Sequence, residues 1–127
     1  MRKLLISSAI LTATIATGGA LQPVGAAAPA PNGETLFRQR CQSCHSVAAG
    51  RTTPLGPNLV GVVGRKAGST PFRYSPALKA SGLTWSRATL DRFLAAPTRT
   101  VPGTRMVVAV PDAAQRAALI GYLETKR

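Results

Sequence analysis

Cys41-Gln42-Ser43-Cys44-His45 is the stretch that decides how this chain is interpreted. Two cysteines three residues apart lie on one side of a helical turn, and a histidine follows the second cysteine directly. This spacing is typical of covalent haem attachment. Each thiol adds to one vinyl group of the same haem, and the histidine is carried beneath the iron as an axial ligand. Cys41, Cys44 and His45 are therefore predicted to bind one c-type haem.

Other uses of the cysteine pair fit less well. A disulfide between residues three apart closes a very small loop, so it constrains the unfolded chain little. A catalytic thiol pair normally follows a strand in a βαβ pattern, and no such strand precedes Cys41. A zinc site built on this pair and His45, the only histidine in the chain, would lack a fourth ligand.

Residues 1–26 are predicted to be a secretory signal peptide. The chain starts with Met1-Arg2-Lys3, continues with an apolar run that begins at Leu4, and reaches small residues before residues 26–28. Cleavage within 26–28 is expected, and the sequence leaves the bond open. An uncleaved membrane anchor is the alternative, although serine, threonine and glycine weaken the run and it is short for a membrane span.

The exported chain is expected to hold one small domain, residues 33–127, after a flexible Pro/Ala tail over residues 27–32. Four segments begin with a capping residue and carry an apolar face. They start at Asn32, Ser75, Ser86 and Asp112. Residues 48–68, rich in glycine and proline, are predicted to form a long ordered loop, and residues 97–105 another. The predicted fold class is all-α, with about four helices and long loops wrapped around the haem.

Met106 is the only methionine left once the signal is removed. It follows a Pro-Gly-Thr turn and stands beside valines. Filling a gap in the core is the usual role of a methionine. In a chain with a histidine-ligated iron, it is instead predicted to be the sixth ligand, and His/Met ligation raises the haem potential.

Several separated motifs resemble those of the class I cytochromes c, the small soluble carriers of bacterial periplasms and mitochondria. Besides the haem motif they are Gly33–Phe37, Gly56–Gly61, Gly64–Lys66, Phe72–Ser75, Gly82–Trp85, Val101–Met106 and Leu119–Leu123.

The resemblance implies a cytochrome c fold and a role for each matching residue. Pro57 would give its carbonyl to His45. Arg65, Tyr74 and Trp85 would hold the haem propionates. The first helix would pack closely on the last. One departure is Phe93, which stands where many relatives have a tyrosine that bonds the methionine sulfur.

A haem with both axial sites filled by protein leaves no room for a substrate, so the sequence predicts an electron carrier and not an enzyme. The resemblance implies a monomeric periplasmic shuttle between a quinol–cytochrome c oxidoreductase and a terminal oxidase or photosynthetic reaction centre. A dedicated acceptor or subunit of a periplasmic dehydrogenase is the alternative. A peroxidase or gas sensor with an open iron site would need Met106 to be displaced.

The charge of the chain fits such partners. The net charge is +12, and loss of Arg2 and Lys3 with the signal leaves +10. A strongly basic protein is steered to acidic docking surfaces. Nucleic-acid binding is also associated with high positive charge, but the export signal and the lack of a basic cluster argue against it. No membrane insertion is expected after signal removal.

Overall fold

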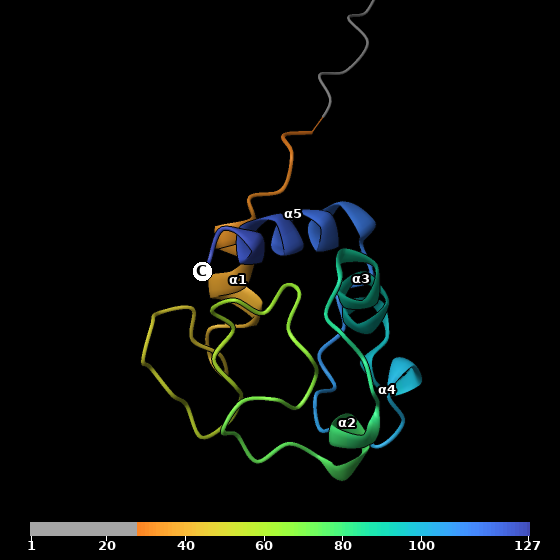
Figure 1. The fold of residues 1–127 in the computed structure, drawn as a ribbon. Coiled ribbons are helices and arrows are strands. Elements are labelled where there is room, and N and C mark those ends of the chain that lie inside the picture. The colour runs from red at the N-terminus through yellow and green to blue at the C-terminus, as the bar shows by residue number, and fades with distance from the viewer. Residues whose placement is uncertain (1–27) are drawn as a thin grey trace, which may run out of the picture.

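The computed structural model of the protein describes residues 28–127. The predicted signal peptide and its cleavage bond lie outside these residues. Within them the chain forms five α-helices joined by irregular loops (Figure 1). The sheet-like pairing in this range is an isolated antiparallel bridge between Lys66 and Thr84. The predicted all-α class is confirmed.

Four of the helices begin where a capping side chain predicts them. They are α1 (Gly33–Arg40), α2 (Pro76–Ala80), α3 (Arg87–Ala95) and α5 (Ala113–Glu124). In each, the side chain of the preceding residue accepts a hydrogen bond from an amide of the first turn, as Asn32 does from Thr35 at 2.9 Å and Asp112 from Gln115 at 2.7 Å. These bonds satisfy amides that have no partner inside the helix.

The fifth helix, α4 (Pro97–Thr100), was predicted as loop, and that prediction is wrong. Pro97 ends α3 but also occupies the first turn of α4, where the missing N–H is not needed. The hydroxyl of Thr100 donates to the carbonyls of Arg92 and Ala96 at 3.0 and 2.9 Å. Pro97 and Val101 are buried. This turn is therefore held by its contacts with α3 and the core.

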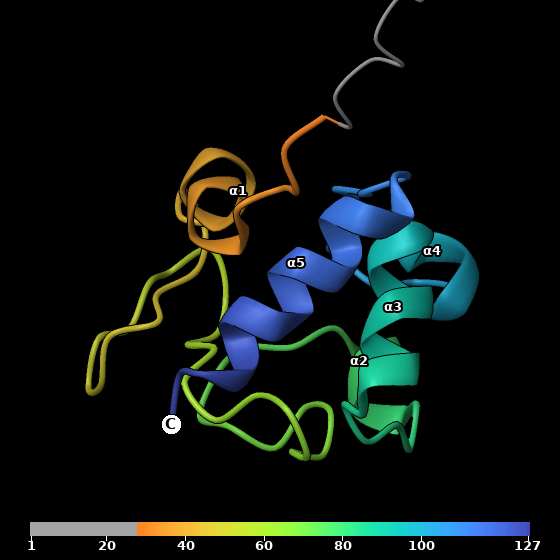
Figure 2. The ribbon, with the colours of Figure 1, turned by 90° about the horizontal axis from the view of Figure 1, so that it is seen from above.

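The longest helix, α5, contacts α1 and α3, and Figure 2 shows it running between them. Gly33 makes the close approach of α1 to α5 possible, because a Cβ there would stand 2.1 Å from the carbonyl oxygen of Ala118 and 2.8 Å from the Cβ of Tyr122. One turn further along α1, the rings of Phe37 and Tyr122 lie 5.6 Å apart. The predicted packing of the first helix on the last is present.

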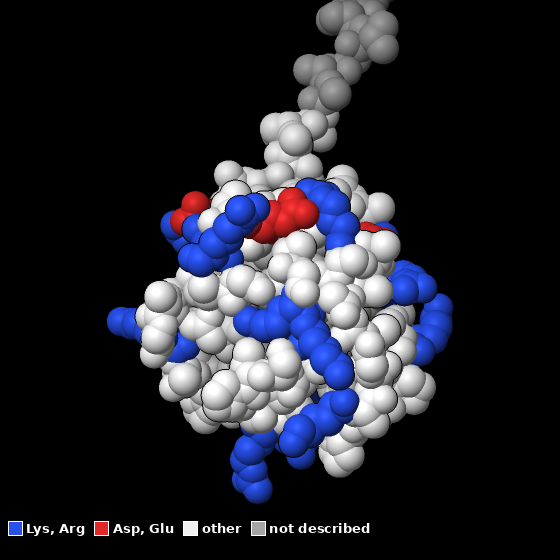
Figure 3. Space-filling model, in the orientation of Figure 1, with Lys and Arg blue, Asp and Glu red and all other residues white. Residues whose placement is uncertain are grey.

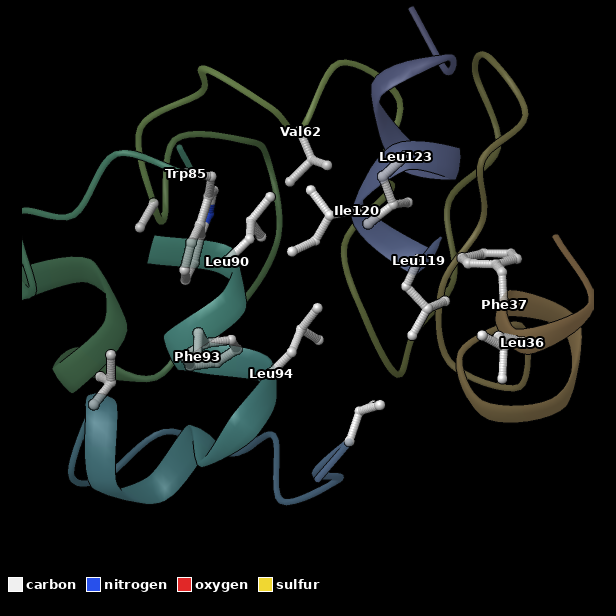
Figure 4. Packing of buried hydrophobic residues seen from close by; sticks show 13 residues of the cluster. Leu36, Phe37, Val62, Trp85, Leu90, Phe93, Leu94, Leu119, Ile120 and Leu123 are labelled. Atoms are coloured by element: carbon white, nitrogen blue, oxygen red, sulfur yellow. The ribbon is translucent and has the colours of Figure 1, made fainter. Parts of the chain in front are cut away.

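The core is one cluster of buried apolar side chains drawn from the helices and from the loops that precede α2, α3 and α5 (Figure 4). Trp85 packs against Phe93 with their ring centroids 5.0 Å apart. From there the cluster continues through Leu94 and Ile120 to Leu119 and Phe37. Cys41 and Met106, both predicted to bind the haem, are partly buried and pack against this same cluster.

The long loop predicted over residues 48–68 is present and is ordered by hydrogen bonds within itself. The side-chain amide of Asn58 donates to the carbonyls of Ala48 and Arg51 at 2.7 and 2.6 Å. The amide of Gly61 reaches the carbonyl of Lys126 at 2.7 Å and ties the loop to the end of α5. None of the helices in residues 28–127 is long and apolar enough to cross a bilayer.

Candidate haem site

The haem-attachment motif forms a tight turn directly after α1. The amide of Cys41 still bonds to the carbonyl of Phe37 at 2.9 Å, and the amides of Cys44 and His45 both bond to the carbonyl of Cys41, at 3.0 and 2.8 Å. The two thiols are unpaired and half-buried. Because one turn carries all three side chains, the helix positions both thiols and the imidazole together.

The imidazole of His45 is oriented by the backbone of Pro57. Its Nδ1 lies 2.8 Å from the carbonyl oxygen of Pro57. A carbonyl can only accept, so Nδ1 carries the proton and donates it, which leaves the lone pair on Nε2. Burial lowers the pKa of His45, and the bond to Pro57 offsets part of that shift. The ring is therefore neutral near pH 7 and able to bind a metal through Nε2.

Gly56 packs against the same imidazole. A Cβ built on this glycine would lie 2.7 Å from Nδ1 and Cε1 of His45 and 2.7 Å from the carbonyl oxygen of Cys44. Distances this short are repulsive, so any larger side chain would push the ring or the motif away. The two residues therefore have different roles: Gly56 allows the loop to approach the imidazole of His45 closely, and Pro57 supplies the carbonyl that bonds to it.

Thr53 supports this turn, although no sequence pattern marks it. Its hydroxyl bonds to the carbonyl of Cys44 and, at 2.8 Å, to the carbonyl of Gly56, while accepting from the amide of Gly56 at 3.2 Å. The residue therefore joins the haem motif to the loop that orients His45. A threonine three residues before a Gly-Pro pair is a weak signal, which explains why the pattern alone did not reveal it.

The acidity of Cys41 argues against thiol redox chemistry. Burial raises its pKa, the neighbouring Arg40 lowers it by less, and Cys44 raises it further. A catalytic thiol needs a lowered pKa so that the nucleophilic thiolate is present at neutral pH. Among residues 28–127 no three His, Cys, Asp or Glu side chains gather where they could hold a metal ion.

Met106 lies in the segment between α4 and α5, half-buried against the apolar core. The preceding residue holds this segment to another loop, because Nη1 of Arg105 donates to the carbonyl of Arg73 at 2.7 Å. The two following residues, Val107 and Val108, are 72% and 46% exposed. The methionine therefore points inward where its neighbours point to solvent.

The three residues predicted at the propionates occupy different settings. Trp85 is buried in the core cluster. The guanidinium of Arg65 donates to the carbonyls of Val60 and Asn58 at 2.8 and 2.9 Å, so it braces its own loop. The hydroxyl of Tyr74 bonds to that of Thr70. Arg65 and Trp85 are neighbours through the backbone, since the amide of Trp85 bonds to the carbonyl of Arg65 at 2.9 Å.

These residues fit a covalently bound haem. The neutral His45 offers Nε2 to an iron, the unpaired thiols stand on the same turn, and Cys41, Met106 and Trp85 all pack on one apolar cluster. A large flat cofactor needs such an apolar surface beside a few placed polar groups.

Comparison with known proteins leads to the same conclusion. The profile of the family described as "Cytochrome c" matches residues 30–126. Cytochrome c2 from Rhodomicrobium vannielii is 48% identical over 74% of this chain and 76% of its own. Cytochrome c type-1 from Ascaris suum is 45% identical over 73% of this chain and 84% of its own.

Among solved structures, cytochrome cH from Methylobacterium extorquens superimposes with a TM-score of 0.68 at 43% identity, over 74% of this chain and 95% of that one. This protein belongs to the cytochrome c family, as a class I member: it binds haem c covalently and carries electrons, and it is not an enzyme.

Proposed function

We propose that this protein is a periplasmic carrier of single electrons, in which His45 and Met106 would be the two protein ligands of the haem iron. The observation that carries the proposal is the bond from His45 Nδ1 to the carbonyl of Pro57, which leaves Nε2 for the iron. Met106 is the remaining soft ligand of the exported chain. When bound, the haem supplies one-electron oxidation and reduction.

In this proposal the residues that bind the iron keep nearly the same positions in the oxidised and in the reduced protein. His45 is held by Pro57 and Gly56, and the chain around Met106 is tied to Arg73 through Arg105. The apolar cluster against which Cys41 and Met106 pack excludes water from that side. Fixed ligands and a dry surrounding reduce the rearrangement that accompanies a change of charge.

Export rests on the first 26 residues, whose charge and hydropathy are those of a signal peptide. We propose that cleavage within 26–28 releases the domain into the periplasm after a short Pro/Ala tail. Residues 28–32 of that tail are exposed and lie outside any helix.

The distribution of charge supports acidic partners. The sequence holds four acidic residues, all on or next to α1, α3 and α5, and none stands between Glu34 and Asp91. Three of them bind arginines in ion pairs, and the fourth, Asp112, caps α5. Figure 3 shows the acidic groups at the end of the molecule where α1 and α5 lie, with Lys and Arg over the rest of that face.

Residues 35–90, which include His45, and residues 92–111, which include Met106, therefore hold positive charge with no acidic residue among them. The Lys and Arg residues of the loops in these ranges are Arg51, Arg65, Lys66, Arg73 and Arg105, and the short helices α2 and α4 add Lys79 and Arg99. Exposed apolar side chains accompany them, namely Val107 and Val108 after Met106 and Leu55 in the loop after His45. Apolar contacts within a charged rim are typical of a docking surface.

Electron transfer to an acidic partner is expected to slow as salt is added. Uncompensated cations raise the rate of encounter, and the attraction falls once the Debye length shrinks, from about 10 Å at 0.1 M to about 3 Å at 1 M salt. Stopped-flow oxidation by an acidic redox protein should lose at least about tenfold in second-order rate over that range. A rate that does not depend on salt would contradict docking through this charge.

A visible spectrum of the exported protein tests the ligation. We expect a haem that acid acetone does not extract, a weak band at the red end in the oxidised state from the Met–iron(III) bond, and no carbon monoxide binding after reduction. An extractable pigment would contradict covalent attachment. Carbon monoxide binding without the red band would indicate an open iron site and favour the sensor or peroxidase alternative.

A further inference from the structure

Two ion pairs join α3 to α5, one helical turn apart on α3. Nη2 of Arg87 lies 2.6 Å from Oε2 of Glu124, and Nε of Arg116 lies 2.7 Å from Oδ1 of Asp91. Their surroundings differ. The side chain of Arg87 is 57% exposed, whereas that of Arg116 is 12% exposed. The guanidinium of Arg116 is thus largely shielded from solvent, although its partner Asp91 is 45% exposed. A hydrogen-bond donor shielded from water makes stronger bonds than an exposed one.

Arg116 also binds the backbone that follows Met106. Its Nη1 donates to the carbonyl of Pro111 at 2.6 Å and to that of Val110 at 3.0 Å. Val110 is only 1% exposed, and its amide bonds to the carbonyl of Leu94 at the end of α3 at 2.8 Å. One guanidinium therefore fastens three parts of the molecule, namely α3, α5 and the segment that carries Met106.

We propose that Arg116, oriented by Asp91, is a positioning residue that keeps Met106 on the iron. This inference rests on the proposed ligation by Met106. The segment from Arg105 to Val110 is fixed at one end by the bond to Arg73 and at the other by Val110 and Arg116. Loosening the second attachment gives the methionine more freedom when it is dissociated, so the dissociated state becomes more populated.

Exogenous imidazole measures that population, because it binds the iron only where methionine has left. Its apparent affinity rises in proportion to the fraction of protein in the binding-competent state. Residues 97–112 contain no lysine or histidine, so no side chain of this segment competes through a nitrogen ligand. The assay uses the oxidised holoprotein near pH 7, follows loss of the red-end band, and is paired with urea unfolding.

The decisive variant is Arg116→Lys, with Glu124→Gln as the matched control. A lysine keeps the charge opposite Asp91 but has a single nitrogen, so it cannot reproduce both the Nε contact with Asp91 and the Nη1 contacts with the two carbonyls. We expect imidazole to bind Arg116→Lys about five- to tenfold more tightly than the wild type. Glu124→Gln breaks the other α3–α5 pair without touching the methionine segment, so its imidazole affinity should stay within about twofold.

The outcomes separate the two proposals. Equal imidazole affinity in both variants, or a change in step with the loss of global stability, would overturn the positioning role. If the wild type itself lacks the red-end band, the proposed ligation fails instead. If Arg116→Lys does not fold, Asp91→Asn replaces it. That variant should shift imidazole affinity in the same direction by a smaller factor, and no shift would overturn the inference.

Discussion

Replacing Met106 with alanine is expected to convert a closed haem into one that binds external ligands. Alanine has no atom that can reach the iron as a ligand, and Met106 is the only methionine of residues 27–127. Reduced Met106→Ala should therefore bind carbon monoxide. Its reduction potential should fall by on the order of a few hundred millivolts, since thioether ligation favours ferrous iron and axial ligands span about 0.8 V in haem proteins. Spectra with carbon monoxide and a redox titration measure both effects.

Val107→Ala is the control for this experiment. Val107 is adjacent to Met106, but its side chain is 72% exposed. Its truncation should leave the red-end band, the potential and the lack of carbon monoxide binding unchanged. A Met106→Ala variant that does not bind carbon monoxide and keeps the potential of the wild type would show that Met106 is not the sixth ligand.

Gly33→Ala is expected to have the largest effect on stability. The added Cβ would stand 2.1 Å from the carbonyl oxygen of Ala118, which belongs to the backbone of α5 and cannot rotate away. The two helices would have to separate, and the contact between Phe37 and Tyr122 would be lost with them. The free energy of unfolding of the holoprotein should fall by about 3 kcal/mol, the upper end for overpacking. Urea unfolding followed by the haem absorbance measures it.

The same helix pair offers a matched control in Gly121→Ala. Gly121 lies inside α5, and the nearest atom to a Cβ built there is Nη2 of Arg87 at 3.9 Å, an ordinary contact. Replacing a glycine within a helix by alanine stabilises by about 0.5–1 kcal/mol. An unchanged or raised stability in Gly33→Ala would contradict the tight crossing of α1 and α5.

The helix starts were predictable because their causes are local. Asn32, Ser75, Ser86 and Asp112 each cap the helix that follows through a bond to an amide three residues ahead. By contrast, α4 was missed. A proline both ends a helix and starts one, and the four residues of α4 have no side-chain cap. The helix α4 forms because Val101 is buried and because the hydroxyl of Thr100 bonds to carbonyls at the end of α3. Both causes depend on the position of α3.

The residues of the candidate site also fall into two groups, those that the sequence predicted and those that it did not. The haem motif, Pro57 and Met106 were recognisable from spacing, from elimination and from likeness to a family. The bonds of Arg65 to Asn58 and Val60 were not, because they link the side chain to carbonyls whose direction depends on the loop's path. Thr53 and Arg116 were not singled out either. Their partners are backbone atoms, which every residue has, so no sequence pattern marks them.

By itself the sequence determined the covalent chemistry of this protein, the capped starts of four helices and the excess of positive charge, because these follow from residue type and short spacing. Only the tertiary structure decided which nitrogen of His45 bonds to Pro57, how closely α1 meets α5, and where the segment that carries Met106 is fastened. The first two of these features join residues 12 and 85 positions apart, His45 with Pro57 and Gly33 with Ala118. These hydrogen bonds and packing contacts form only after the chain has folded, because folding brings the distant donors, acceptors and backbone surfaces together.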